Sequence, residues 1–225
     1  MANDVVAILG GTGEQGLGLA YRFAAAGRAV RIGSRKLPRA LEAAEQVLGR
    51  IESADVVGLE NADATRQAAG GIVILSVPFE HTVGTLKSIR EALAPDTVVV
   101  SMGVPLATAV GDVAARTIGV SQGSCAELVE SLVPDGVPVV SAFQNVAAHR
   151  LLAIDESVEC DVIVSGKPGP RKQVMALCDD IPGARAINGG PLYNARYVEN
   201  LTALMIGINI RYKLREGTGL RITYI

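Results

Sequence analysis

The residues with the clearest chemical meaning lie near the N-terminus, where three glycines have the G-x-G-x-x-G spacing of a dinucleotide-binding turn. They are Gly11, Gly13 and Gly16. The apolar run 5–10 precedes them and predicts a buried strand, and a helix over 17–26 is expected to follow. In such a unit the first glycine permits a tight turn, the second lets the backbone approach a diphosphate, and the third lets the helix pack close to the strand. The diphosphate would then lie at the positive end of the helix dipole.

The end of the second expected strand, 29–33, indicates which dinucleotide binds. NAD enzymes carry an Asp or Glu there, which accepts a hydrogen bond from the ribose hydroxyl. This chain has Ser34, Arg35 and Lys36 instead, with Arg39 one helical turn later. A guanidinium pairs with phosphate in bidentate fashion, so the pattern favours NADP over NAD. The alternative is that Arg35 or Lys36 is an ordinary solvated surface charge.

Beside this motif the chain offers little acid–base or metal chemistry. None of its five tyrosines has a lysine four residues on, so the Tyr-x-x-x-Lys pair of short-chain dehydrogenases is missing. The two histidines are His81 and His149, and the three cysteines follow no metal spacing, so no metal site is predicted. A carbonyl reduction needs a proton donor, whereas hydride transfer between two redox cofactors needs mainly alignment. We therefore expect no catalytic side chain and a reaction that depends on proximity and orientation.

Strand and helix patterns alternate along the chain, which predicts an α/β fold. The expected class is a Rossmann-like, doubly wound parallel sheet with a small C-terminal helical part that closes the cleft. Residues 1–187 are expected to form the NADP-binding domain, and 188–225 the cap over the cleft and a dimer contact. Strands are expected at 5–10, 29–33, 55–59, 72–77, 97–102, 138–143 and 160–166, and helices at 17–26, 38–49, 63–70, 81–93, 123–132, 170–181 and 192–213.

Composition limits the classes of partner. Apolar residues make up 49% of the 225 residues, enough for a sizeable core, and the net charge of −2 offers no basic field for nucleic acid. No signal peptide is visible, and the apolar run 201–210 is about half the length that a membrane span needs. We expect a cytoplasmic protein without a membrane or nucleic-acid partner.

Seven stretches carry a resemblance to a known family: GGTGEQGLGLA, GSRK, SVPFEH, SMGVP, VVSAFQNVAA, CDVIVSG and GGPLYNARYVENLT. They cover nearly the whole chain and resemble the NADPH-dependent coenzyme F420 reductases, or F420H2:NADP+ oxidoreductases. The resemblance implies reversible hydride transfer between nicotinamide C4 of NADP(H) and C5 of the 5-deazaflavin. It also implies NADP phosphate contacts at Thr12, Gly13, Glu14, Gln15, Ser34, Arg35 and Arg39. Because an acid beside a diphosphate is unfavourable, Glu14 is expected to contribute only its backbone N–H.

The deazaflavin side is expected where further parallel strands end. Ser76, Val77, Pro78, Gly103 and Val104 are candidates there, the apolar ones as walls, although each valine or proline has a core or turn role as its alternative. His81 follows them and could line the cleft or serve in capping or packing. Some relatives have histidine where this chain has Gln144, which puts a titratable role at that position in doubt.

Two segments further along the chain supply the remaining candidates. Asn145, Val146 and Ala147 follow the strand expected at 138–143 and are expected to contact the cofactors. Arg196 and Thr202 lie on the last helix, and the resemblance implies that they help to hold the cofactors. The alternative for Arg196 is an ion pair with Glu199 or Glu130.

Other functions stay open at this stage. One is an NADP-dependent reductase on the same fold that acts on an imine, a quinone or a ferric chelate. Another is a module that binds NADP as a sensor without turnover. The apolar last helix and the segment LRITYI (220–225), read as an edge strand or tail, suggest a homodimer.

Overall fold

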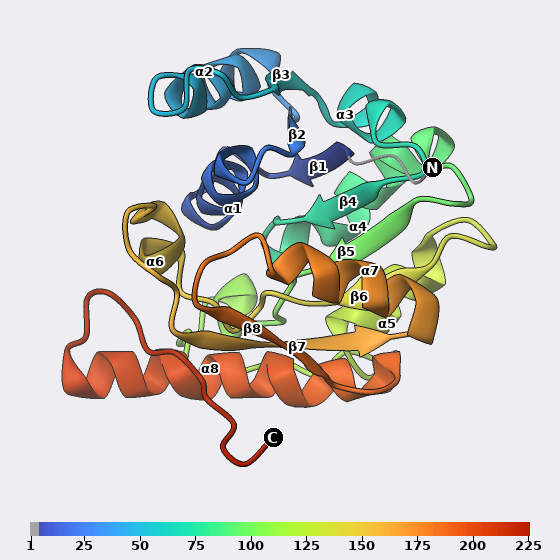
Figure 1. The fold of residues 1–225 in the computed structure, drawn as a ribbon. Helices are drawn as coiled ribbons and strands as arrows, with labels where there is room; N and C mark the ends of the chain where they lie inside the picture. Colours follow the sequence, from blue (N-terminus) through green and yellow to red (C-terminus); the bar gives the residue numbers. More distant parts are fainter. Residues whose placement is uncertain (1–4) are drawn as a thin grey trace.

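The computed structural model describes residues 5–225, which form one eight-stranded sheet (Figure 1). Its strand order is β3-β2-β1-β4-β5-β6-β7-β8, and its first six positions have the 3-2-1-4-5-6 order of a Rossmann sheet. This confirms the predicted fold class. The strands are β1 Val5–Leu9, β2 Ala29–Ser34, β3 Val56–Glu60, β4 Ile72–Leu75, β5 Val98–Ser101, β6 Val139–Ser141, β7 Cys160–Gly166 and β8 Ala184–Asn188.

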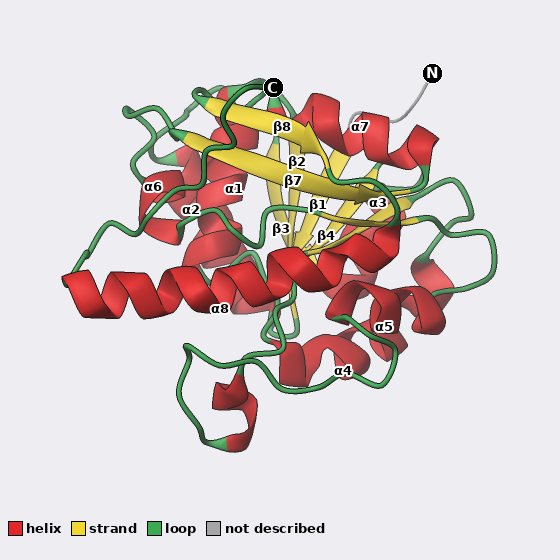
Figure 2. Cartoon of the chain, turned by 90° about the horizontal axis from the view of Figure 1, so that it is seen from below, coloured by secondary structure: helices red, strands yellow, loops and turns green. Residues whose placement is uncertain are grey.

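Helices cover both faces of the sheet, so that the described residues form three layers (Figures 1 and 2). One core lies between the sheet and α1, α2, α6 and α7, and the other between the sheet and α3, α4, α5 and the start of α8. The α-helices are α1 Glu14–Ala25, α2 Leu37–Leu48, α3 Asn61–Gln67, α4 Phe79–Ile89, α5 Cys125–Leu132, α6 Ala148–Leu152, α7 Pro168–Cys178 and α8 Ala195–Tyr212. Short 3-10 helices lie at η1 Arg90–Ala92, η2 Ala107–Val110 and η3 Leu192–Asn194.

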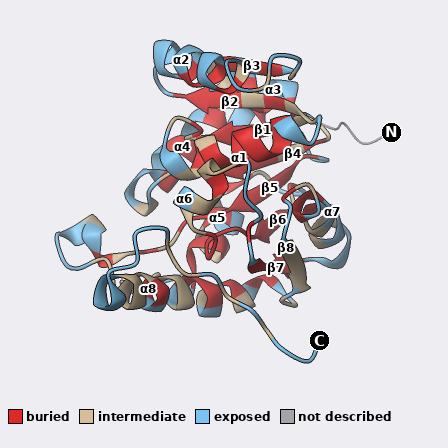
Figure 3. Ribbon diagram, turned by 60° about the vertical axis from the view of Figure 1, so that its left-hand side comes forward, coloured by how far each residue is buried: buried red, intermediate tan, exposed pale blue. Residues whose placement is uncertain are grey.

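The central strands are apolar because both of their faces are covered. Val98, Val99 and Val100 of β5 are each 2% exposed or less, and they alternate between the two cores. Burial follows this layering: the strands are mostly buried, while the outer faces of α2 and α8 are exposed (Figure 3). Local sequence also sets helix starts. Ser124, for example, accepts a hydrogen bond from the backbone N–H of Glu127 and so caps α5.

The sheet departs from the prediction at its far edge. β7 runs antiparallel to β6, with Ser141 opposite Ser165, whereas the other neighbouring strands pair in parallel. β8 and the five-residue helix α6 are additional elements that the sequence patterns did not reveal. Because of the reversal, β7 starts on the side where β6 ends, and the side chain of Asn145 contacts Asp161 there.

The C-terminal part returns to the sheet after α8. Figures 1 and 2 show the C-terminal half of α8 projecting beyond the sheet. The tail then packs across the starts of β7 and β8, where the backbone N–H of Asp161 donates to Leu220 O at 2.7 Å. Residues 220–225 form no strand, so the expectation of an edge strand was wrong and that of a tail was right.

The predicted division into 1–187 and 188–225 stays a prediction. Residues 1–4 of the first range lie outside the described residues, and the boundary falls one residue before the end of β8. No helix within residues 5–225 is long and apolar enough to span a membrane.

Candidate active site

The glycine turn between β1 and α1 leaves almost no room for side chains. Gly10 has φ +82°, and a Cβ there would lie 2.3 Å from the carbonyl oxygen of Ser76. A Cβ on Gly16 would lie 2.7 Å from Gly11 Cα, which confirms that Gly16 allows the helix to approach the turn closely. Gly13 is the N-cap of α1 and meets only Gly10 O at 3.6 Å, so the backbone is accessible there. Gly10 was missed in the sequence, where it reads as the end of a strand, although its left-handed φ is the one that requires glycine.

A cavity of about 540 Å³ extends from this turn to the end of β2; we call it the cationic cavity. The side chains of Arg35, Lys36 and Arg39 are exposed around it. Ser34 lies beside them with its hydroxyl oxygen accepting from the N–H of Lys36 at 3.2 Å. Three cations and no acid therefore line this cavity, as its described lining shows: Gly10, Thr12, Gly13, Ser34, Arg35, Lys36, Arg39, Asn61, Ser76, Val77, Pro78, His81 and Thr85.

A second cavity, the central cavity, adjoins the first across Gly13 and the segment 76–78. It measures about 360 Å³, and its walls are mostly apolar. Glu14 is the one ionisable side chain among the described residues that line it. The lining comprises Gly13, Glu14, Gln15, Gly16, Ser76, Val77, Pro78, Met102, Val104, Leu106, Gln144, Thr202 and Ile206.

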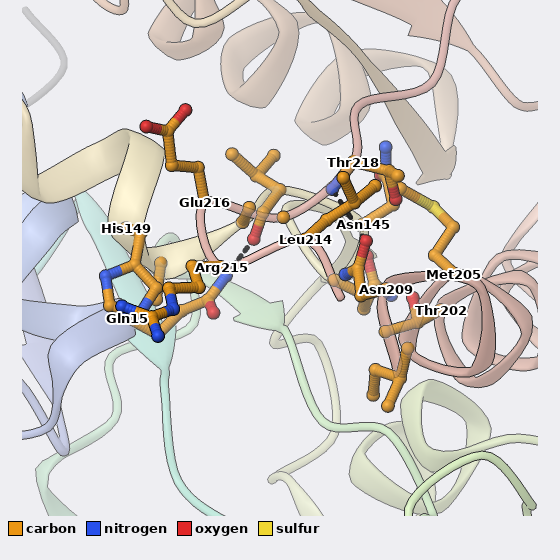
Figure 4. Close-up of a pocket in the computed structure, with 16 residues that line it drawn as sticks. Gln15, Asn145, His149, Thr202, Met205, Asn209, Leu214, Arg215, Glu216 and Thr218 are labelled. Carbon is orange, nitrogen blue, oxygen red and sulfur yellow. Dashed lines mark hydrogen bonds between the residues drawn. The ribbon is translucent and has the colours of Figure 1, made fainter. Parts of the chain in front are cut away.

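A third cavity, the far cavity of about 240 Å³, shares Gln15, Gln144, Thr202 and Ile206 with the central cavity. In Figure 4 Gln15 lies on one side of it, while Thr202, Met205 and Asn209 lie on the side of α8. Segments 144–149 and 214–218 complete its lining. Because neighbouring cavities share walls, the three form one groove past the carboxyl ends of β1, β2, β4, β5 and β6, where ligands bind in open α/β sheets.

The turn after β6 forms the wall between the central and far cavities. Phe143 is fully buried and has φ +69°, a left-handed conformation that residues other than glycine rarely adopt. The Gln15 side-chain N–H donates to Val146 O at 2.8 Å and to Phe143 O at 3.3 Å. Asn145 Nδ2 donates to Asp161 O at 2.7 Å, and Gln144 donates to the hydroxyl of Ser141. Within the described residues, the side-chain oxygens of Gln144 and Asn145 are buried and lack a hydrogen-bond partner.

Most of the predicted residues line the groove, but three lie beside it. Gly11 lies behind the turn, where a Cβ would be 3.0 Å from Ile8 O and from Ile32 Cγ2. The guanidinium of Arg196 pairs with the carboxylate of Glu127 at 3.0 Å, rather than with Glu199 or Glu130, and it does not line any of the three cavities as described. Gly103 packs against α5, because a Cβ there would lie 2.4 Å from Cys125 Sγ. A cofactor contact by any of these three residues stays a prediction.

Glu199 has a different partner from the one considered in the sequence. Its buried carboxylate accepts from the backbone N–H groups of Cys125 and Ala126 at the start of α5, at 2.9 and 3.2 Å. Burial raises the pKa of this carboxyl to about 7 in spite of the two hydrogen bonds, which lower it. The Glu199 side chain thus joins α8 to α5 less than one helical turn before Thr202, which lines the groove with Ile206.

Nucleophilic and metal chemistry find little support in the structure. Burial raises the pKa of the Cys125 thiol to about 12, so the thiol is protonated at neutral pH. Cys160 and Cys178 are buried free cysteines as well. Residues 5–225 contain no group of three or more His, Cys, Asp or Glu side chains that could hold a metal ion.

Comparison with known proteins agrees with this geometry. Residues 5–105 match the profile of the family described as NADP oxidoreductase, coenzyme F420-dependent. The F420-dependent NADP reductase of Methanocaldococcus jannaschii is 46% identical over 223 residues, which cover 97% of both chains. The chain belongs to this family. The F420-dependent NADP reductase of Methanothermobacter thermautotrophicus is 42% identical over 223 residues, covering 97% of this chain and 94% of that one. The family assignment made from the sequence motifs is confirmed.

Solved structures show how widely the fold of this family is shared. A protein of Arthrobacter sp. FB24, for which F420-dependent NADP reductase activity has been suggested, superposes with a TM-score of 0.81 at 23% identity, covering 97% of this chain and 99% of that one. An imine reductase from Bacillus cereus superposes with a TM-score of 0.62 at 17% identity, covering 93% of this chain and 63% of that one. At these identities the likeness concerns the fold alone.

Proposed function

We propose that this member of the family catalyses reversible hydride transfer between NADP(H) and coenzyme F420 in the groove. The observation that carries the proposal is the order of the cavities. The cation-lined cavity shares Gly13 and the segment 76–78 with an apolar cavity, and this apolar cavity shares Gln15, Gln144, Thr202 and Ile206 with the third. An anionic nucleotide and two flat rings need this sequence of environments.

On the NADP side, the diphosphate is assigned to the N-terminus of α1. The backbone of Thr12, Gly13 and Glu14 is accessible there, and the helix dipole favours an anion. The 2′-phosphate is assigned to Ser34, Arg35 and Arg39 at the other end of the cationic cavity. A carboxylate at the end of β2 would repel that phosphate, and this chain has none among the described residues that line the cavity.

The ring systems are assigned to the central and far cavities. Val77, Pro78 and Val104 form apolar walls of the central cavity, and Val146 and Ala147 contribute to the far cavity with Thr202 on α8. With both coenzymes bound, a hydride would pass between nicotinamide C4 and deazaflavin C5, and the proton that balances the reduced deazaflavin would be exchanged with solvent away from these carbons. The chain's residues then align the rings and exclude water, and no side chain has to supply a proton at the reacting carbons.

The helix α8 and the tail are proposed to close the groove. The far cavity is lined on the C-terminal side by α8 and by the tail residues 214–218, and α8 contributes Thr202, Met205, Ile206 and Asn209. The backbone N–H of Thr218 donates to Asn209 Oδ1 at 3.0 Å, which joins the two. This cap corresponds to the C-terminal part expected over 188–225.

The direct test mixes the protein with NADPH and oxidised coenzyme F420 and follows the visible absorbance of the deazaflavin. We expect the absorbance to bleach, and to return when excess NADP+ is added to the reduced coenzyme. NADPH oxidation with imines or quinones, but not with coenzyme F420, would favour the alternative reductase. NADP binding without turnover of any acceptor would indicate the sensor function.

A homodimer and a cytoplasmic location belong to the same proposal. Tyr197 and Leu204, seven residues apart on α8, are 66% and 59% exposed, and such an apolar helix face is typical of a subunit contact. Light scattering on the Leu204→Lys variant should show a monomer where the parent chain is a dimer. A reducing compartment accords with the three free cysteines.

A further inference from the structure

One side chain connects the helix assigned to NADP with the wall assigned to coenzyme F420. Gln15 lies in the first turn of α1, within the turn assigned to the diphosphate. Its side chain does not turn toward the cationic cavity. It reaches the carbonyl oxygens of Val146 and Phe143, and it lines both the central and the far cavity (Figure 4). Gln15 therefore belongs to the helix assigned to the diphosphate, while it lines the cavities assigned to the rings.

The segment that Gln15 holds needs external support. A non-glycine residue in the left-handed region is strained and persists only where its surroundings hold it, and Phe143 is in that region. Its ring packs edge-to-face on Phe23 of α1, with the centroids 6.2 Å apart. Gln144 and Val146, which follow it, both line the groove. The conformation of this turn therefore sets the shape of the wall against which the second ring would lie.

The rest of α1 supports the continuation of the same segment. The guanidinium of Arg22 is 2% exposed and donates to five backbone carbonyls: those of Arg150, Leu151, Ala153, Ile154 and Glu156. Gly18 lets the helix approach closely, since a Cβ there would lie 2.5 Å from Leu151 Cβ. Gln15 is the member of this set of contacts that reaches the groove.

We propose that Gln15 is a positioning residue for the deazaflavin. By holding the Phe143–Val146 turn, its amide fixes the groove wall at the distance from the nicotinamide that hydride transfer requires. This inference rests on the proposed function, and it assigns the side chain to the F420 side although the residue belongs to the NADP turn. The expected NADP phosphate contact of Gln15 stays a prediction, which its backbone N–H could meet.

The test compares Gln15→Met, which keeps the length of the side chain but lacks the N–H donor, with Gln15→Lys, which restores a donor. Gln46→Met, an exposed glutamine on α2, serves as the matched control. For Gln15→Met we expect the KM for coenzyme F420 to rise about tenfold, the value for one lost hydrogen bond, while the Kd for NADP stays within about twofold. Gln15→Lys should recover part of the loss, and Gln46→Met should match the parent chain.

Two outcomes would overturn the inference. One is a weaker Kd for NADP with an unchanged KM for coenzyme F420, which would make Gln15 an NADP contact. The other is a lowered melting temperature with unchanged KM and kcat, which would make its role purely structural. If Gln15→Met does not fold, Gln15→Asn, which keeps the amide but is one carbon shorter, takes its place with the same expectations.

A further measurement separates this inference from the proposed function. Amide hydrogen exchange in the absence of ligands should speed up at residues 143–147 in Gln15→Met and not in Gln46→Met. Unchanged exchange at these residues would contradict the claim that Gln15 holds this turn, whichever substrate the enzyme reduces. A parent chain that fails to reduce coenzyme F420 would contradict the proposed function. The exchange result would then still show whether Gln15 holds the 143–147 segment.

Discussion

The two ends of the groove are built in different ways. In the cationic cavity the decisive side chains, Arg35, Lys36 and Arg39, are exposed and surround a backbone turn. In the far cavity the lining side chains are themselves hydrogen-bonded to the backbone, as are the buried Asn145 and the half-buried Gln15. The first end can change its ligand preference with little effect on folding, whereas the second cannot lose a support without losing stability.

The difference follows from sequence distance. The cationic cavity is made by residues that are close along the chain, between Gly10 and Arg39, and the 76–85 segment completes it. The far cavity depends on contacts across more than a hundred residues, such as those of Gln15 with Val146 and of Arg22 with Leu151. Substitutions that remove such long-range contacts should act on stability, and those in the cationic cavity on affinity.

The largest effect is expected from Arg22→Met. Five backbone carbonyl groups would lose the guanidinium as donor, one in a buried hydrogen bond and four in partly buried ones. Hydrogen bonds to charged groups contribute about 1.5–3 kcal/mol each, although not additively. We expect the free energy of unfolding to fall by about 3–5 kcal/mol in urea denaturation. Arg50→Met is the control, because Arg50 meets the same segment at Leu152 O and Asp155 from an exposed position. It should change stability by less than about 1 kcal/mol. Equal losses in both variants would show that the burial of Arg22 does not matter.

The next effect concerns the anchor of the tail. The carboxylate of Asp161 is fully buried and accepts from Arg185 at 2.7 Å, from Arg221 at 3.0 Å and from the N–H of Ile222 at 2.6 Å. Asp161→Asn removes the buried negative charge and one of the two acceptor oxygens that Arg185, Arg221 and the N–H of Ile222 share, so the free energy of unfolding should fall by about 2–3 kcal/mol. Asp155→Asn, whose side chain is 91% exposed, is the matched control and should be near neutral.

The pH dependence of this anchor has a defined sign. The hydrogen bond from Arg185 is the main reason that the pKa of Asp161 lies well below its usual range. The ionised Asp161 side chain therefore contributes its full stabilisation above about pH 4, the approximate pKa of an unfolded Asp, and this stabilisation is lost progressively below that pH. Acid should release the tail in the parent chain, as proteolysis after residue 213 would report. Because the pKa is so low in the folded chain, the protection should decline gradually below about pH 4. Protection that does not decline at all in acid would contradict the anchor.

A smaller effect of opposite sign is expected at Glu199, which joins α8 to α5. Because burial raises its pKa to about 7, the folded chain keeps a proton that the unfolded chain releases from about pH 4.5 upward. The free energy of unfolding should therefore fall between about pH 5 and 7 by on the order of 1–2 kcal/mol from this group. Glu199→Gln should flatten that decline, while Glu130→Gln, an exposed residue of α5, should not. The same slope in all three chains would contradict the buried position of Glu199.

These contrasts also explain what the sequence could predict. Strands β1 to β5 and the cofactor turn were predictable because apolar runs, glycines and charges within short windows determine them. β8 was missed because Ala184–Asn188 is an edge strand of mixed character, partly exposed along its length. α6 has five residues, too few for a periodic pattern.

Long-range partners were beyond local patterns. The antiparallel direction of β7 depends on how β7 pairs with β6, and the apolar sequence of β7 does not indicate this direction. The helix position of Arg196 suggested Glu199 or Glu130, yet its partner is Glu127, because Glu199 is occupied by the N-terminus of α5. Gln15 was recognised from its place in the turn, but the direction of its side chain required the structure.

The central claim is that Arg35 and its neighbours select NADP by its 2′-phosphate, and titration calorimetry of Arg35→Glu tests it most directly. The loss of a charged hydrogen bond should weaken the free energy of NADP binding by roughly 1.5–3 kcal/mol, which raises the Kd for NADP about tenfold to 150-fold. The Kd for NAD should stay the same or fall. Lys172→Glu, an exposed charge reversal on α7, controls for net charge and should leave both values unchanged. An unaltered Kd for NADP in Arg35→Glu would contradict the claim.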